Sequence, residues 1–180
     1  MDQSIKTIKI AVTGPEASGK SYTSEYLARI FDGWVVPEFA REYLNYLDRA
    51  YNYQDVVNIA KGQMDVEQKV MADALKEHID FVFFDSELIN TRIWMDEKFG
   101  ECEPFVLDAI QESDYDHYLL MKPDIEWEPD PLRENPYDRD RLFELHIQHL
   151  NFFQKSFTVI EGDRDQRLKM AIAVVKTLKA

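Results

Sequence analysis

The chain has 180 residues, 45% of them hydrophobic and 31% charged, which is the balance of a globular protein with one full core. A formal net charge of −13 argues against non-specific binding to nucleic acids or anionic membranes, whose phosphates attract clustered lysine and arginine. No apolar run reaches the roughly 20 residues of a membrane helix, and the single cysteine, Cys102, excludes an internal disulfide and favours the reducing cytoplasm.

The N-terminal stretch leads directly into a predicted strand and a glycine-rich loop. Residues 1–14 lack the basic start, apolar middle and cleavage site of a signal peptide, in keeping with a cytoplasmic location. The β-rich run 8–13 ("IKIAVT") predicts the strand, and residues 20–31 predict the helix after it. Between them, "GPEASGKS" matches the pattern G-x-x-x-x-G-K-[ST]. Its glycines let backbone N–H groups face phosphate oxygens at a helix N-terminus.

This loop predicts a binding site for ATP and Mg²⁺. In such a loop, Lys20 reaches the β- and γ-phosphates and the hydroxyl of Ser21 coordinates the metal ion. The residues expected to contact the nucleotide here are Gly14, Pro15, Glu16, Ala17, Ser18, Gly19, Lys20, Ser21 and Tyr22. The strand before the loop and the helix after it are the structural context that the pattern requires.

A second apolar run, "WVVP" at 34–37, predicts the next strand, and a helix follows over 38–47. Glu38 therefore stands at the carboxyl end of a strand, where open parallel sheets bind ligands. Its carboxylate is the first candidate for the base that accepts the proton of a substrate hydroxyl, and a glutamate of the first helical turn is an equally good interpretation. Arg41 on the same helix face and Tyr43, which suits stacking on a flat ring, are candidate substrate contacts.

A long helical pattern over residues 54–78 carries Gln63 on an apolar face, either as a hydrogen-bonding partner of the substrate or as a surface residue. The run "DFVFFD" at 80–85 then predicts a buried strand that ends at Asp85. A carboxylate in that position suits a magnesium ion held directly or through water, and Asp85 is also the second candidate base. The alternative is that Asp85 caps the helix predicted over 87–99.

The second half of the chain adds two strands, two helices and a long polar segment. Strands are predicted over 116–121 and 157–162, and helices over 138–155 and 164–178. Proline and charge without periodicity over 122–137 predict a mobile lid. Because apolar strands alternate with helices throughout, we predict one α/β domain of the P-loop NTPase class. Its parallel sheet of about five strands lies between helices.

The predicted lid carries arginines that a closing loop can bring to the phosphates. Arg133 and Arg139 are the two candidates for neutralising the transferring phosphoryl group, and a purely structural role for one of them stays open. His146 and His149 have a spacing compatible with a metal, but no cysteine or carboxylate trio completes a site. We therefore interpret the two histidines as part of a helix face.

Five sequence blocks together resemble the ribosylnicotinamide kinase domain of NadR-type NAD-biosynthesis proteins. In chain order they are "VTGPEASGKS", "VPEFAREYL", "FFDSELINTRIW", "YDHYLLMKPDIEWEPDPLRENP" and "VIEGDRDQR", which together extend over almost the whole chain. The resemblance implies that Glu38 and Arg41 face the nucleoside and that Asp85 faces the hydroxyl or the magnesium ion. It also implies that Arg133 faces the phosphates and that Gly162 gives the backbone room near adenine.

The chain departs from that family at two places. Such domains are often joined to an adenylyltransferase domain with an H-x-G-H motif, and this sequence contains no such motif, so only the kinase half is implied. The family usually shows D-T-D where this chain has Asp85, Ser86 and Glu87. The replacement preserves the charge and the hydroxyl but lengthens one side chain.

The resemblance implies an ATP- and Mg²⁺-dependent kinase that phosphorylates the ribose 5′-hydroxyl of nicotinamide riboside or a close relative. The residues expected to contact the substrate are Glu38, Arg41, Tyr43, Gln63, Asp85 and Arg92. Two alternatives stay open: a kinase for another nucleoside, and a P-loop ATPase or nucleotide switch without a small-molecule acceptor. ATP and a nucleoside-like molecule are the expected partners, whereas the sequence leaves the oligomeric state open.

Overall fold

One parallel sheet organises the computed structural model, which describes residues 6–179. Its strands are β1 (Ile8–Thr13), β2 (Trp34–Val36), β3 (Phe81–Asp85), β4 (His117–Met121) and β5 (Phe157–Ile160). They lie in the order β2-β3-β1-β4-β5, and each neighbouring pair is parallel. The prediction of a five-stranded parallel sheet is therefore confirmed.

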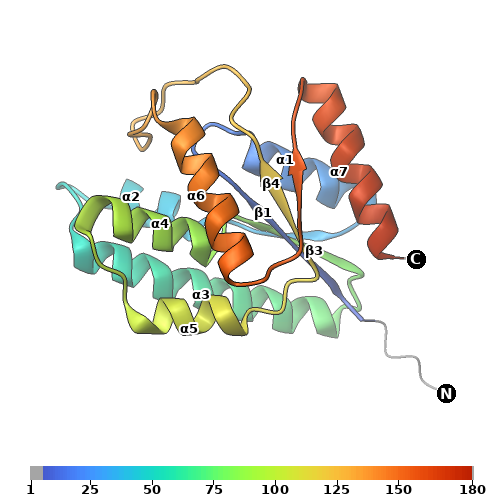
Figure 1. Ribbon diagram of the computed structural model, residues 1–180. Helices are drawn as coiled ribbons and strands as arrows, with labels where there is room; N and C mark the ends of the chain where they lie inside the picture. Colours follow the sequence, from blue (N-terminus) through green and yellow to red (C-terminus); the bar gives the residue numbers. More distant parts are fainter. Residues whose placement is uncertain (1–5, 180) are drawn as a thin grey trace.

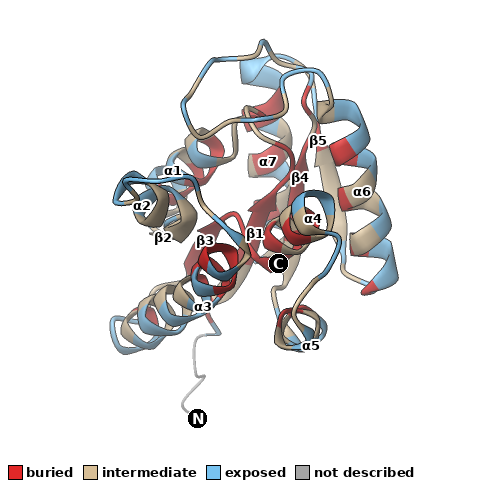
Figure 2. Ribbon diagram, turned by 90° about the vertical axis from the view of Figure 1, so that its left-hand side faces the viewer, coloured by how far each residue is buried: buried red, intermediate tan, exposed pale blue. Residues whose placement is uncertain are grey.

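Helices cover both faces of this sheet (Figure 1). They are α1 (Lys20–Phe31), α2 (Phe39–Asn45), α3 (Tyr53–Lys76), α4 (Leu88–Phe99), α5 (Pro104–Glu112), α6 (Arg139–Phe152) and α7 (Arg164–Leu178). Helices α1 and α7 pack on one face, and α3, α4, α5 and α6 pack on the other. Figure 2 shows the buried residues along the sheet and on the helix sides that face it.

The helices on both faces of the sheet explain why the strands are apolar along their whole length. Every residue of β3 is buried, and along β1 the side chains alternate between the two layers. Ile10 and Val12 belong to the cluster with α1 and α7, whereas Ala11 belongs to the cluster with α4 and α6. A strand that is buried on both faces carries a continuous apolar run, which is why these runs were recognisable in the sequence.

Helix α5 is the element that the sequence analysis did not predict. It begins at Pro104, a favoured residue for the first turn of a helix, and it buries Val106 and Ile110. Two buried positions one turn apart make too short a pattern to distinguish a helix from a loop. Several predicted boundaries also differ by one to three residues. For example, β5 ends at Ile160, α6 ends at Phe152, and α2 covers only Phe39–Asn45.

The segment between β4 and α6 contains no helix or strand over residues 122–138, as the sequence predicted. In Figure 1 this gold segment arches over the carboxyl ends of the strands. Its mobility stays a prediction. No helix within residues 6–179 combines the length and the apolar character needed to cross a membrane.

Candidate active site

The glycine-rich loop leaves β1 and enters α1 through backbone conformations that favour glycine. Gly14 has a φ of 134° and Gly19 a φ of 84°. A Cβ atom on Gly14 would come within 2.6 Å of the carbonyl oxygen of Met121, at the end of β4. Both the conformation and the close approach therefore require glycine at position 14. The loop ends at the N-terminus of α1, where unpaired N–H groups favour an anion.

The side chain of Lys20 lies back across this loop. Its Nζ atom donates to the carbonyl oxygens of Gly14 and Pro15 at 2.9 and 2.8 Å. Burial lowers the pKa of Lys20, and the negative charges of Glu38 and Asp85 oppose that shift. The ammonium group thus lies close to the two carboxylates that the sequence analysis selected as candidate bases.

Asp85, the last residue of β3, is only 7% exposed, and its Oδ1 atom has no hydrogen-bond partner among residues 6–179. Burial raises the pKa of Asp85 to about 6, while the neighbouring Ser21 hydroxyl opposes that shift. The alternative role of Asp85 as a helix cap is wrong, because the carboxylate of Glu87 caps α4 by accepting from the N–H of Ile89 at 2.7 Å.

The donors around Asp85 suit a magnesium ion. An unpartnered carboxylate oxygen beside the Ser21 hydroxyl is the oxygen donor set that Mg²⁺ prefers. Within the described part of the chain, no group of three or more His, Cys, Asp or Glu side chains is arranged to hold a metal. A magnesium ion at Asp85 would therefore take its other ligands from water and phosphate oxygens, as Mg²⁺ commonly does.

A small cavity of about 60 Å³ lies beside the carboxyl ends of β2 and β3. Its lining consists of Glu38, Ala40, Ile59, Gln63, Ser86, Glu87, Asn90, Thr91 and Trp94. The cavity brings together two residues that the sequence analysis selected, Glu38 and Gln63. It adds Asn90 and Thr91 of α4, which the sequence analysis missed, although their place one turn after a strand end was a usable signal.

A chain of polar side chains runs from this cavity into the core. Thr13 donates to Glu87 at 2.9 Å, and the Asn90 amide donates to Thr13 at 3.1 Å. The ring of His146 lies 2.7 Å from the Asn90 oxygen and 2.7 Å from the carbonyl of Leu142. Burial raises the pKa of Glu87 to about 7 and lowers that of His146 to about 3. His146 is thus a buried core residue that connects α6 to Asn90 of α4, which in turn contacts the end of β1.

Gln63 is not a surface residue. It is 4% exposed, and both ends of its amide have protein partners. Its Oε1 atom accepts from the backbone N–H of Phe39 at 2.9 Å, and its Nε2 atom donates to Glu67 at 3.1 Å. The surface alternative is therefore wrong, although the side chain still lines the small cavity.

Two other expected substrate residues, both in α2, contact protein groups. Arg41 pairs with Asp130 of the predicted lid at 3.0 Å, and the Tyr43 hydroxyl donates to Asp55 at 3.0 Å. Neither is among the described residues that line the small cavity. Both side chains thereby attach α2 to its surroundings.

Arg92 is likewise outside the lining of the small cavity. Its Nε atom pairs with Asp96 on the same helix at 3.3 Å, and its guanidinium lies 5.4 Å from the centre of the Phe153 ring. These contacts place the side chain between α4 and the end of α6.

The predicted lid is bonded to the phosphate loop. The carboxylate of Glu16 accepts from the N–H of Glu134 at 2.8 Å and from the side-chain amide of Asn135 at 2.6 Å. Arg139 donates to the carbonyl oxygen of Ala17 at 3.2 Å. In this conformation Arg139 therefore joins the lid to the phosphate loop.

Arg133 is held within the lid. It donates to the carbonyl oxygen of Glu128 and lies 5.9 Å from the centre of the Trp127 ring. Burial is the main cause of the lowered pKa of Lys20, nearby carboxylates oppose it, and the positive charge of Arg133 adds a smaller lowering effect.

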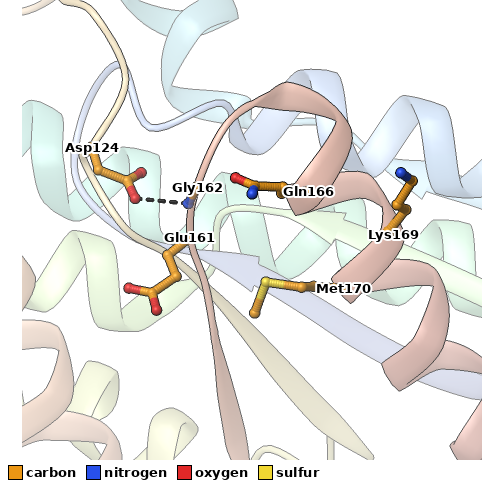
Figure 3. A pocket seen from close by; sticks show the side chains of 6 residues that line it. All are labelled: Asp124, Glu161, Gly162, Gln166, Lys169 and Met170. Carbon is orange, nitrogen blue, oxygen red and sulfur yellow. Dashed lines mark hydrogen bonds between the residues drawn. The ribbon is translucent and has the colours of Figure 1, made fainter.

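A second, more open hollow of about 520 Å³ lies between the start of the lid and α7 (Figure 3). Its lining consists of Asp124, Glu161, Gly162, Gln166, Lys169 and Met170. Gly162 has a φ of 95°, and its N–H donates to Asp124 at 2.8 Å. The resemblance placed Gly162 near adenine, and the hollow is the open space beside that residue.

A family model described as an AAA domain matches residues 9–167. The chain belongs to the AAA domain family. It is also 28% identical over 176 residues to the trifunctional NAD biosynthesis/regulator protein NadR of Salmonella typhimurium, and equally to that of Escherichia coli. Each match covers 94% of this chain but 42% of NadR, so the chain spans less than half the length of these relatives.

Solved structures show the same fold. A NadR structure in complex with NR superposes with a TM-score of 0.79 at 22% identity, covering 97% of this chain and 52% of that one. Thymidylate kinase from Ehrlichia chaffeensis gives 0.64 at 16% identity, covering 96% and 98%. Deoxyadenosine kinase from M. mycoides with bound dATP gives 0.61 at 14% identity, covering 94% and 100%. The P-loop nucleoside kinase-like fold and the resemblance to NadR are thereby confirmed.

In this AAA domain, one buried arginine that the sequence analysis did not select connects the phosphate loop, the start of the lid and the loop after β5. Arg167 is 4% exposed and donates to the carbonyl oxygens of Ser18 at 2.9 Å and Gly162 at 2.8 Å. It also pairs with Asp124 at the start of the lid. The usable signal was an arginine one turn into the helix that follows the "VIEG" strand.

Proposed function

We propose that this AAA domain is an ATP- and Mg²⁺-dependent kinase that phosphorylates the ribose 5′-hydroxyl of nicotinamide riboside or a close relative. The observation that carries the proposal is the small cavity that Glu38 lines, next to a phosphate loop whose lysine interacts with that carboxylate. A cavity with a carboxylate beside a phosphate loop suits an acceptor hydroxyl. Similarity to NadR, including a NadR structure in complex with NR, supports the choice of nucleoside.

In this proposal, ATP lies along the phosphate loop with its base in the hollow beside Gly162. The backbone N–H groups of residues 14–22, except that of Pro15, which has none, bind the phosphates. Lys20 exchanges its bonds with two loop carbonyl groups for bonds with phosphate oxygens. Its positive charge then stabilises the charge that develops on the transferring group. The one cysteine of the chain fits action in the reducing cytoplasm.

Ser21 and Asp85 are the proposed magnesium ligands. A magnesium ion held by these two side chains would supply positive charge that neutralises the phosphate oxygens. The unpartnered oxygen of Asp85 supports this role, because a buried carboxylate without a partner is costly unless a ligand completes it.

Glu38 is the proposed base, with Asp85 as the second candidate. The carboxylate accepts the proton of the substrate hydroxyl as that oxygen forms a bond to the γ-phosphorus atom. The bond between the γ-phosphorus and the bridging oxygen breaks, and ADP leaves with the electron pair. Because phosphoryl transfer depends mostly on positioning and charge, Glu38 matters chiefly by orienting the hydroxyl.

The remaining predicted side chains belong to the same proposal. Arg133 reaches the transferring phosphoryl group from the lid, whereas Arg139 holds the lid to the phosphate loop. Substrate contacts of Arg41, Tyr43 and Arg92 would require each side chain to exchange its present protein partner for the substrate.

ATP turnover with and without a panel of nucleosides tests the proposal. ADP formation that depends on nicotinamide riboside, together with a 5′-phosphorylated product, is the expected result. Dependence on a different nucleoside identifies the alternative kinase. ADP formation without acceptor dependence or phosphorylated product identifies an ATPase or nucleotide switch and contradicts the kinase assignment.

A further inference from the structure

Helix α2 begins without help from its own first side chain. Glu38 occupies the N-cap position with extended backbone angles (φ −68°, ψ 108°), and its carboxylate makes no capping hydrogen bond within the described chain. The first N–H groups of a helix have no partner inside the helix, so they are usually satisfied by the N-cap side chain or by water. The N–H of Phe39, the first residue of the helix, donates to Gln63 of α3, at 2.9 Å.

The amide of Gln63 is held in the orientation that this bond requires. A backbone N–H can only donate, and a carboxylate accepts, so the amide oxygen faces Phe39 and the amide nitrogen faces Glu67. Glu67 is held in turn by the hydroxyl of Tyr115, which donates to its other oxygen at 2.7 Å. Glu67 of α3 and Tyr115, in the segment before β4, thus keep the Gln63 oxygen in place at the start of α2.

Gly62, the neighbour of Gln63, supplies an independent observation. A Cβ atom at this position would lie 2.0 Å from the ring of Phe39, at its Cε1 atom, and 2.5 Å from Cδ1. The ring therefore packs directly against the backbone of α3, an approach that only glycine allows. Glycine is an unfavourable residue inside a helix, and its position here at the contact with Phe39 indicates that this packing matters.

We propose that Gly62 and Gln63 are positioning residues that hold Phe39 so that the neighbouring Glu38 carboxylate stays free to face the acceptor cavity. We call these two residues the Phe39 seat. The inference rests on the proposed function, in which Glu38 is the base. It also changes the expected role of Gln63, which acts through Glu38 instead of contacting the substrate, although both residues line the small cavity.

A double-mutant cycle tests the catalytic part of the inference. Gln63→Leu removes the acceptor, and Gln68→Leu, at an exposed glutamine of the same helix, is the matched control. Gln63→Leu is expected to lower nucleoside-dependent kcat by roughly 10²-fold, the effect of a small misplacement, with KM and ATP-analogue affinity little changed. In a Glu38→Gln background the same substitution should change kcat less than about twofold, since coupled residues are not additive.

Three kinetic results would overturn the positioning role. One is an undiminished effect of Gln63→Leu in the Glu38→Gln background, and another is wild-type kcat in the Gln63→Leu protein. The third is a rise in KM at constant kcat, which would return Gln63 to direct substrate contact. Gly62→Ala is expected to lower kcat in the same way as Gln63→Leu. If Gly62→Ala does not fold, the measurements on Gln63→Leu alone test the positioning role.

Amide hydrogen exchange measures the Phe39 seat without any reference to activity. The Phe39 N–H should be protected in the wild type and in Gln68→Leu, and should exchange at least about tenfold faster in Gln63→Leu. Equal exchange in wild type and Gln63→Leu would show that the seat does not exist. A wild type that phosphorylates no nucleoside would overturn the proposed function and the positioning role together, while the exchange data would still decide whether Gln63 holds Phe39.

Discussion

At the scale of single residues, the site depends on charges kept close together under partial burial. The negative charges of Glu38 and Asp85 oppose the lowered pKa of Lys20, and burial is the largest cause of the shifted pKa of both Lys20 and Asp85. Such an arrangement is unfavourable without a bound ligand and favourable with phosphate and a cation present. Substitution of each residue should therefore have a distinct effect on turnover, on ATP-analogue affinity or on stability.

Lys20→Ala should reduce ATP-dependent turnover by roughly 10²–10³, the usual effect of removing one preorganised donor. The fold should persist, because the substitution removes bonds to loop carbonyl groups and leaves the core intact. Steady-state turnover together with circular dichroism checks both statements. Wild-type turnover in a folded Lys20→Ala protein would contradict the assignment of the phosphate site.

Glu38→Gln retains the size of the side chain but removes the proton acceptor. Nucleoside phosphorylation should slow by roughly 10²–10⁴, whereas the affinity for an ATP analogue should barely change, because Glu38 follows a different strand from the phosphate loop. Both quantities are measured on the same variant. Turnover near wild type would transfer the role of base to Asp85, and a collapse of ATP binding would contradict two separate binding regions.

Asp85→Asn should stabilise the protein in a pH-dependent way. The folded pKa of about 6 lies above the unfolded value of 3.8, so the folded state holds more protons between these values and stability falls as pH rises from about 4 to 6. Above pH 6 the wild type should therefore be less stable than Asp85→Asn, by at most about 3 kcal/mol. Urea unfolding at pH 4 and pH 8, without magnesium, measures this. An equal difference at both pH values would contradict the burial of an ionised Asp85.

At the scale of elements, the lid is the segment with the least support from the core. It lacks regular structure over residues 122–138, and its attachments include polar side-chain bonds to α2, α4, α7 and the phosphate loop. Such bonds can break singly without opening the core, which favours local opening.

The segment 122–137 should be mobile without nucleotide and ordered with it. Hydrogen exchange should be fast in the free protein and slower with an ATP analogue. Glu16→Gln should increase exchange at Glu134 in the free protein, because the neutral amide accepts more weakly from its N–H than a carboxylate does. Equal protection with and without the analogue would count against a lid.

At the scale of the whole molecule, Arg167 connects segments that are far apart in the sequence. It bonds the phosphate loop at Ser18, the loop after β5 at Gly162 and the start of the lid at Asp124. Arg167→Met should lower the free energy of unfolding by about 2–4 kcal/mol, because the carbonyl groups lose a shared donor and Asp124 loses its cation. Its affinity for an ATP analogue should also fall. Denaturant unfolding and a binding titration measure the two effects. An unchanged free energy of unfolding would contradict the role of Arg167 in connecting these segments.

Features that depend on local pattern could be predicted from the sequence. Buried parallel strands have continuous apolar runs, so the sheet was predictable, and the phosphate loop has a defined spacing of glycine, lysine and serine. The positions of Glu38 and Asp85 followed from the strand ends. Helix α5 was not predicted, because its buried face, Val106 and Ile110, is only one turn long.

The partner of each polar side chain depends on how the helices and strands pack against one another. Periodicity places Gln63 on a face of α3, but its bond to Phe39 exists because α2 packs on that face, over Gly62. In the same way, Arg41 meets Asp130 at a separation of 89 residues. The physical reason is that a hydrogen bond needs atoms within about 3 Å, a condition that packing between elements sets and local sequence does not. The roles of these side chains were therefore open in the sequence, whereas the sheet and the phosphate loop were not.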